Sequence, residues 1–343
     1  MTNDGRRAPA VLIVGAGAMG LVTGYHLRLA GALVTFLVRP ARVPELRRPL
    51  VLYSYDDASL KTLSDYQVIS NAVHIASSEY EFVIITLDGA STRTPDGTAL
   101  LGSIGESIRN SPAVVIIGGV GIGLRDHYLL TMNLPAHRIL NGGLGLLCHQ
   151  VAPTRFPVHT PTLSEMLTKA DVAYRHVNKN GFLLDDSFPE AGRAFATLYD
   201  ACGVSRCAIL KKPVFAMLMK LMFPIFSASE LLGWPYAEEL GKDRSTWPIT
   251  VRAIKEIMGF REHGWIGKVG QLFLTKGMLL KLWKSLEKST LPLDFPAFNR
   301  FHHGGKVRSQ DLQLLRACAD EGERQGLSMR SLRELLSKVE ALH

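Results

Sequence analysis

AVLIVGAGAMG, residues 10–20, determines the architecture that we predict for this chain. Its first five residues are apolar, as in a buried parallel strand, and a glycine-rich segment follows directly. A helical pattern then runs from about residue 21 to residue 30. The pattern G-x-G-x-x-G between a strand and a helix is typical of dinucleotide-binding folds. The sequence therefore predicts a Rossmann-type α/β domain at the start of the chain.

Each glycine of this segment has a predicted role. Gly15 permits the tight turn, Gly17 lets the backbone approach a pyrophosphate, and Gly20 lets the helix pack closely on the strand. The N-terminus of the helix faces the anion. We therefore predict that the pyrophosphate is bound by the consecutive residues Gly15, Ala16, Gly17, Ala18, Met19 and Gly20.

The end of the second strand, residues 33–38, predicts which dinucleotide is bound. A site for NAD carries Asp or Glu at this position, where the carboxylate binds the ribose 2′-hydroxyl. This chain has Arg39 there, with Arg42 nearby. Because a guanidinium suits a 2′-phosphate, the predicted cofactor is NADPH.

The rest of the chain divides into an alternating half and a helical half. Strand patterns at 82–86, 113–117 and 138–147 alternate with helical ones, which indicates a parallel sheet. We expect short antiparallel segments at 155–160 and 171–176, and helices at 98–109, 187–201, 212–233, 246–263, 266–289, 309–321 and 328–341. The predicted fold class is α/β: a Rossmann domain over residues 1–208, then an all-α domain over residues 209–343. The ligand is expected between these domains, at the carboxyl ends of the strands.

Charge and cysteine content limit the function classes. The chain of 343 residues has 39 Lys and Arg against 31 Asp and Glu, and residues 242–288 hold 10 basic against 4 acidic ones. No nucleic-acid motif accompanies this excess, so we predict a solvated helical face and no nucleic-acid partner. The four cysteines lack metal-ligand spacing, so no metal site is predicted, and they suit a reducing cytoplasm.

Two apolar stretches raise the question of a membrane. The stretch 213–234 contains Lys220 and is interrupted by Pro224, so we expect a kinked, buried helix and no integral membrane segment. The stretch 269–288 mixes Leu, Phe, Met and Trp with several lysines. We expect it to pack its apolar side on the core, and the alternative is that it lies on a membrane surface.

Several segments together resemble the ketopantoate reductase family over nearly the whole chain. They are residues 11–20, the strand ending 34–40, Gly118–Gly121, the lysine-bearing helix 217–221 and the segment 310–329. The resemblance implies an NADPH-dependent reductase with a Rossmann domain and a helical domain, and it makes a homodimer an expectation. Leu87 and Gly119, which follow two of the predicted strands, complete the predicted cofactor contacts.

The resemblance also implies a catalytic residue. The family's lysine hydrogen-bonds the ketone oxygen and supplies a proton as hydride arrives, and Lys220 matches it. An ammonium group is suited to the alkoxide that develops. The implied reaction is hydride transfer to the carbonyl carbon of a 2-keto acid or a related ketone.

The remaining polar residues of the family's substrate site are absent. One asparagine falls on Pro224, another on Gly118, the acidic residue on Gln310 (beside Asp311), and a basic residue is replaced by Asp88. Three explanations stay open: reduction of another substrate, such as a bulkier apolar ketone or an imine; NADPH binding without catalysis, as in a sensor; or an alignment of the helical half that is off by one turn. Candidate replacement groups are Ser229, Glu230, His302 and His303, the last two in a predicted loop.

Overall fold

The computed structural model describes residues 7–77 and 79–342, which form two compact units. The N-terminal unit comprises Met1–Arg155 and Thr160–Leu210, and the C-terminal unit comprises Phe156–His159 and Lys211–His343. The predicted boundary after residue 208 falls inside strand β12 (Arg206–Leu210). The segment Phe156–His159 packs with the helical unit although its neighbours on both sides belong to the other one.

The N-terminal unit is built on a large sheet whose order, in the described residues, is β12-β11-β8-β7-β6-β1-β2-β5. From β5 to β8 neighbouring strands are parallel, whereas β11 is antiparallel to β8. This is the Rossmann order, because the chain moves outward from β1 through β2 to β5 and then returns to β6 on the other side of β1. The other strands of this sheet are β1 (Ala10–Val14), β2 (Leu33–Leu37), β5 (Gln67–Ile69), β6 (Phe82–Ile85), β7 (Val114–Ile117), β8 (Ile139–Leu144) and β11 (Asn180–Asp185).

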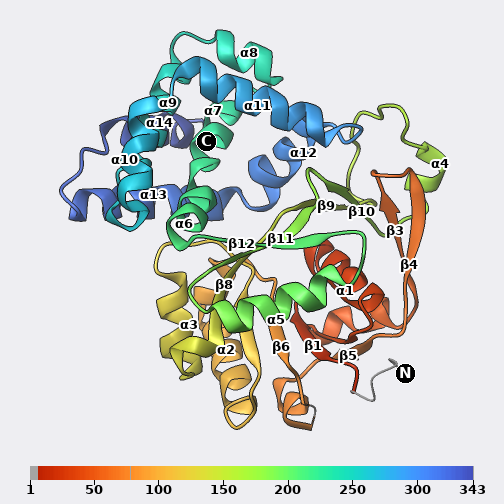
Figure 1. Cartoon of the computed structure of the whole chain (residues 1–343). Coiled ribbons are helices and arrows are strands. Elements are labelled where there is room, and N and C mark those ends of the chain that lie inside the picture. The colour runs from red at the N-terminus through yellow and green to blue at the C-terminus, as the bar shows by residue number, and fades with distance from the viewer. Residues whose placement is uncertain (1–6, 78, 343) are drawn as a thin grey trace. The chain divides into compact units, whose positions relative to one another are not determined.

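Helices cover both faces of this sheet, which explains why β1 is apolar throughout (Figure 1). Val11 and Ile13 belong to a core shared with α1 (Ala18–Leu29) and α5 (Pro189–Asp200). Leu12 and Val14 point to the opposite face, towards α2 (Pro95–Ser107) and α3 (Leu124–Met132). A strand buried on both faces must be apolar at every position, as the sequence pattern indicated.

A second, smaller sheet of order β4-β3-β10-β9 also belongs to this unit. Its strands are β3 (Leu50–Ser54), β4 (Ser59–Leu63), β9 (Leu146–Gln150) and β10 (Val172–His176). The β3–β4 hairpin was not predicted, and neither were β5 and the break between β8 and β9. The expected strand at 155–160 is wrong: that segment forms only an isolated bridge between Val158 and Leu293. The region also contains α4 (Ser164–Leu167).

The C-terminal unit is helical in the part of the chain that the structure describes. Its central helix is α9 (Thr246–Met258), which packs against α6, α7, α10 and α14. The other helices are α6 (Lys212–Leu221), α7 (Phe223–Leu231), α8 (Ala237–Lys242), α10 (Gly264–Phe273), α11 (Lys276–Thr290), α12 (Phe295–Phe301), α13 (Arg308–Arg324) and α14 (Arg330–Glu340). The predicted single helices at 212–233 and 266–289 are each two helices, and neither α8 nor α12 was predicted.

Lys212–Leu231 is long and apolar enough to cross a membrane by length and composition alone. In the structure this stretch is broken at Met222, between α6 and α7, with Pro224 in the first turn of α7. Helix α7 is buried against α9 and α14. Helix α7 therefore has the position of a core helix, as we expected, whereas α6 buries only Phe215 and Lys220.

Candidate active site

The glycine-rich turn after β1 has the geometry that the sequence predicted for it. Gly15 has a φ of +102°, which side-chain-bearing residues rarely adopt, and its N–H donates to Leu37 at 3.0 Å. A Cβ at Gly20 would lie 2.3 Å from the carbonyl oxygen of Gly15. These two glycines therefore allow α1 to begin directly against the turn.

Gly17 differs from its neighbours, because a Cβ there would meet no atom within 4 Å. It is the exposed N-cap of α1, and no side chain caps this helix terminus. The first turn of α1 contains no acidic residue. Open space before uncapped backbone N–H groups at the positive end of a helix fits a pyrophosphate. Gly17, Ala18, Met19 and Gly20 supply this terminus.

Residues at the ends of neighbouring strands lie next to the glycine-rich turn. Thr86, directly after β6, donates through its hydroxyl to the carbonyl oxygens of Val14 at 3.0 Å and Gly15 at 3.2 Å. The side chain of Leu87 lies 3.1 Å from where a Cβ of Gly15 would stand. A Cβ at Gly119 would lie 2.8 Å from the carbonyl oxygen of Leu87. The predicted cofactor residue Leu87 therefore lies close to both Gly15 and Gly119, at the carboxyl ends of β1, β6 and β7.

This location is the switch point of the sheet, because the chain leaves β1 towards β2 on one side and returns to β6 on the other. Ligands of open α/β sheets bind at such points. The sheet topology and the open helix terminus thus indicate the same place independently.

The two arginines predicted to bind the 2′-phosphate differ in their surroundings. Arg39 is exposed directly after β2, and within residues 7–77 and 79–342 its guanidinium has no hydrogen-bond or ion-pair partner. Arg42 ends a short 3₁₀ turn, Pro40–Arg42, and its guanidinium pairs with Glu45. Arg39 is therefore the arginine that is free to bind an anion, whereas Arg42 must first exchange its partner.

Lys220 is buried at the end of α6. Its ammonium donates to the carbonyl oxygen of Ala216 at 2.7 Å and pairs with Oε1 of Glu262 at 2.8 Å. Glu262 is about half exposed, and the neighbouring His263 is fully buried. Burial and the nearby Lys220 charge lower the pKa of His263. The buried cation is thus held by a carboxylate that itself reaches solvent.

The four candidate replacement groups lie in the C-terminal unit, but they already have partners or are packed. Glu230 pairs with Nε of Arg308 at 2.5 Å, and Ser229 is buried. His303 Nδ1 lies 2.7 Å from Oδ2 of Asp311, and its ring stacks on Phe226 at 3.6 Å between centroids. They therefore form part of the packed interior of this unit.

The predicted loop at His302 and His303 is wrong. His302–Lys306 forms a π-helical turn that continues α12, and the His302 ring stacks on Phe298. Burial lowers the pKa of each histidine to about 3, and burial beside Glu230 raises that of Asp311 to about 8. Burial therefore disfavours the charged forms of both His303 and Asp311, which lie within hydrogen-bond distance of each other. Asp311 was noted in the sequence only as the neighbour of Gln310.

Two departures from the family pattern have a structural account. A Cβ at Gly118 would lie 2.8 Å from the carbonyl oxygen of Ile85, so this backbone has no room for a side chain there. Asp88 accepts a hydrogen bond from the backbone N–H of Ser91 at 2.8 Å and so begins the turn Ser91–Arg93. An asparagine is sterically excluded at the first position, and the aspartate at the second stabilises local structure.

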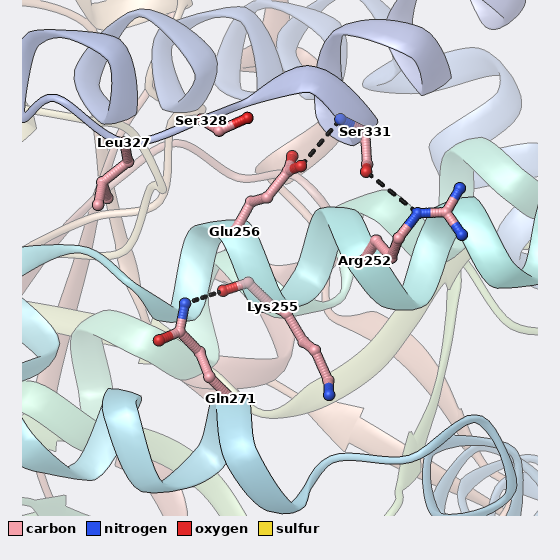
Figure 2. A pocket seen from close by; sticks show the side chains of 7 residues that line it. All are labelled: Arg252, Lys255, Glu256, Gln271, Leu327, Ser328 and Ser331. Atoms are coloured by element: carbon pink, nitrogen blue, oxygen red, sulfur yellow. Dashed lines mark hydrogen bonds between the residues drawn. The ribbon is translucent and has the colours of Figure 1, made fainter.

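A separate open cavity of about 350 Å³ lies on the C-terminal unit, lined by Arg252, Lys255, Glu256, Gln271, Leu327, Ser328 and Ser331 (Figure 2). Figure 2 shows Glu256 directed at the first turn of α14, where its carboxylate accepts from the N–H groups of Ser331 and Leu332 at 2.9 Å each. Gln271 donates to the carbonyl oxygen of Lys255 at 2.7 Å. None of the predicted site residues lines this cavity.

Residues 11–121 match the family model described as ketopantoate reductase PanE/ApbA. No curated protein matches the chain significantly.

Solved structures match along almost the entire chain. A 2-dehydropantoate 2-reductase from Geobacter metallireducens is 16% identical, with a TM-score of 0.66 over 97% of this chain and 100% of the other. D-Mandelate dehydrogenase, in a ternary structure with NADH and anilino(oxo)acetate, is 15% identical, with a TM-score of 0.65 over 97% of both chains. A putative ketopantoate reductase from Ralstonia solanacearum is 16% identical, with a TM-score of 0.63 over 98% of both chains. At these identities the structural matches show a common fold.

The predicted fold class is therefore confirmed: the chain has a Rossmann domain followed by a helical part. The solved 2-dehydropantoate 2-reductase has the same fold. Residues 11–121 are thus similar to the ketopantoate reductase family, and the whole chain shares its fold with the solved 2-dehydropantoate 2-reductase and D-mandelate dehydrogenase.

Proposed function

We propose that this protein is an NADPH-dependent reductase that transfers hydride to the carbonyl carbon of a 2-keto acid or a related ketone. The observation that carries the proposal is the open, uncapped N-terminus of α1 at the switch point beside β1 and β6. It lies in the segment that matches the family model. The four cysteines are all buried, which suits a cytoplasmic protein.

The choice of NADPH over NADH rests on Arg39. Its exposed guanidinium stands directly after β2, where an NAD site has an acidic residue. D-Mandelate dehydrogenase, with the same fold, is described with NADH, so the fold is compatible with either cofactor. The cofactor preference is therefore a property of the residues after β2.

Lys220 is the proposed proton donor, and its surroundings suit that role. When bound, NADPH supplies the hydride. An ammonium group has three N–H donors, and two are directed at Ala216 and Glu262. The third is left for a carbonyl oxygen, whose developing negative charge the buried cation stabilises. As that oxygen becomes a hydroxyl it takes a proton from Lys220, and the half-exposed Glu262 keeps the lysine oriented and in contact with solvent.

The substrate is proposed to differ from ketopantoate. Pro224 and Gly118 stand where the family has asparagines, and the backbone at Gly118 excludes a side chain. The side-chain oxygen of Gln310 is buried and, within the described residues, has no hydrogen-bond partner. These groups favour a bulkier, more apolar ketone or an imine over a small polyhydroxylated acid.

A second candidate function is NADPH binding without turnover, as in a sensor. It is favoured by the same missing polar partners and by the ion pair that engages Lys220. The two candidates share the cofactor site and differ only in catalysis.

The test is NADPH oxidation at 340 nm by the purified protein, after its affinities for NADPH and NADH have been measured. The panel contains ketopantoate, the 2-keto acid that corresponds to mandelate, other aromatic and branched 2-keto acids, and cyclic imines. Turnover that Lys220→Met abolishes supports the reductase. Tight NADPH binding with no turnover of the whole panel supports the sensor, and failure to bind either nucleotide refutes both. The oligomeric state in solution tests the expected homodimer.

A further inference from the structure

Helix α10 (Gly264–Phe273) packs on the C-terminal unit through its glycines. A Cβ at Gly267 would lie 2.2 Å from the carbonyl oxygen of Met258, the last residue of α9. A Cβ at Gly270 would lie 2.8 Å from the Met258 methyl group. The side of α10 that contacts α9 therefore has almost no side-chain volume of its own.

The large apolar side chains of α10 lie on its outer side. Trp265, Val269, Leu272 and Phe273 are 73%, 44%, 77% and 65% exposed. They occupy positions i, i+4, i+7 and i+8, which form one continuous stripe on a helix. This arrangement reverses the usual one, in which a helix buries its apolar stripe against its own core. Our expectation that this region packs its apolar side on the core is therefore wrong for α10.

The charged residues of α10 and α11 are nearly all basic. Residues 264–290 contain five lysines and a single acidic residue, Glu287. Glu287 accepts a hydrogen bond from the N–H of Ala237, so it faces α8. Lys268, on α10, and Lys276, at the start of α11, are exposed and, in the described parts of the chain, have no ion-pair partner. An exposed apolar stripe is thus bordered by unneutralised ammonium groups.

These observations identify the partner by its chemistry. A stripe of Trp, Phe and Leu attracts an apolar phase, and the flanking lysines attract negative charge. A second copy of the chain, docked by a two-fold contact through this face, would bring two faces of the same positive charge together. Nucleic acid would leave the four apolar side chains in water. We infer that the α10 face, defined by Trp265, Val269, Leu272, Phe273, Lys268 and Lys276, docks the protein on an anionic phospholipid surface.

The proposal stands independently of the reductase activity, because it uses none of the residues assigned to cofactor or catalysis. It predicts that the full chain co-sediments with phosphatidylcholine vesicles containing 30% phosphatidylserine, and much less with pure phosphatidylcholine vesicles. Trp265 reports docking directly, because Trp247 and Trp283 are buried and Trp234 is half-buried. Its fluorescence is expected to shift to the blue on anionic vesicles, and the shift should be lost in Trp265→Phe while binding is retained.

Surface substitutions separate the two contributions without disturbing the core. The double variant L272Q/F273Q should weaken vesicle binding roughly tenfold or more, because it removes the apolar anchor. The charge-reversal pair K268E/K276E should weaken binding to anionic vesicles to a similar degree. Leu130→Gln, at an 84% exposed leucine of α3, and Lys169→Glu, at an exposed lysine of the N-terminal unit, are the matched controls. Unchanged NADPH affinity and circular dichroism establish that the variants are folded.

Four results would overturn the inference. The first is that the protein does not bind vesicles with 30% phosphatidylserine, and the second is that L272Q/F273Q binds them as well as the native chain does. The third is self-association without lipid that L272Q/F273Q abolishes. The fourth is binding of RNA or DNA that depends on the lysines, with no binding to vesicles. The third would assign this face to a second copy of the chain, and the fourth to a nucleic acid.

Discussion

Arg39 is the residue on which the proposed preference for NADPH depends. Its guanidinium is exposed and unpaired among the described residues, so removing it exposes no buried partner. Arg39→Ala is expected to raise the dissociation constant for NADPH by about 10- to 100-fold, which corresponds to the loss of one charge-assisted hydrogen bond. The constant for NADH should change by less than about threefold. Isothermal titration with each nucleotide measures both.

The matched control for Arg39 is Arg47, which is exposed in the same region of the chain. Arg47→Ala should leave both affinities unchanged. Equal losses for NADPH and NADH in Arg39→Ala would show that this residue does not contact the 2′-phosphate.

Lys220 is the residue on which catalysis is expected to depend. Lys220→Met keeps an unbranched side chain in the buried site and leaves Glu262 half exposed to water. The turnover number should fall by about 10²- to 10⁴-fold, as for loss of a general acid, with NADPH affinity unchanged. Stopped-flow oxidation of NADPH with the best substrate measures this, and Lys338→Met, at an exposed lysine, is the control. A fully active Lys220→Met enzyme would return this lysine to a structural role.

The sequence indicated Lys220 through a local motif but gave no sign of its partner. Glu262 lies far along the chain, in the short turn Arg261–His263, and an isolated glutamate in a turn has no local pattern. The same reason hid the pairing of His303 with Asp311. Two adjacent histidines are typical of a surface loop, which is what we predicted, whereas packing against Phe226 and Phe298 buries them. Contacts between distant elements are set by tertiary packing, which periodicity does not encode.

At the scale of elements, the turn before α1 contains two glycines that are required for different reasons. A Cβ at Gly20 collides with the carbonyl oxygen of Gly15, whereas one at Gly17 meets open space. Gly20→Ala should therefore lower the melting temperature by several degrees and also weaken NADPH binding. Gly17→Ala should leave the melting temperature within about 2 °C of the native value while weakening NADPH binding, because its methyl group occupies the anion's space.

Thermal melts without cofactor, followed by titration with NADPH, distinguish these outcomes. If Gly17→Ala bound NADPH with native affinity, the pyrophosphate would have to lie elsewhere. A destabilised Gly17→Ala protein would instead mean that the open space is filled in solution.

The elements that the sequence predicted best are those whose burial is uniform. Strand β1 and helix α1 are buried nearly throughout, so both appear as long apolar patterns. The hairpin β3–β4 was missed because β4, Ser59–Leu63, is polar at most positions and only Leu63 is fully buried. The breaks after Leu221 and Phe273 were missed because apolar residues continue across them. Hydrophobic periodicity therefore fails where an element is half-exposed, as β4 is, where apolar residues continue across a break between two helices, and where an apolar stripe faces outward, as on α10.

At the scale of the whole molecule, buried histidines make stability depend on pH. Burial lowers the pKa of His26, His302 and His303 to about 3 and that of His149 to about 4. Each must remain neutral in the folded state, whereas in the unfolded chain each binds a proton below its ordinary pKa of about 6.5. Their contribution to the free energy of unfolding is therefore fully present above pH 6.5 and is lost as the pH falls towards 3. Each histidine removes about 1.4 kcal/mol per pH unit in this range.

Asp311 acts in the opposite direction. Its pKa is raised to about 8, so its contribution is lost as the pH rises from about 4 to 8. It therefore offsets only part of the histidine effect on acidification. The urea midpoint should fall steeply between pH 6.5 and pH 5, and His26→Asn should flatten that slope while His137→Asn, at an exposed histidine, leaves it unchanged. Parallel slopes for all three proteins would contradict the assignment of the effect to burial.

The excursion of Phe156–His159 into the helical unit has a topological consequence. The polypeptide passes between the two units at residues 155/156, 159/160 and 210/211, so no single cut separates them. His159 bonds the buried carboxylate of Asp294 at 2.8 Å, and the Phe156 ring packs on Phe298 and Phe301. After a protease cut between Leu210 and Lys211, the two fragments would therefore stay associated, because Phe156–His159 of the first fragment packs in the helical unit. During synthesis, Phe156–His159 leaves the ribosome before the helices that pack on it, so we expect the helical unit to fold around a segment whose two ends belong to the first domain.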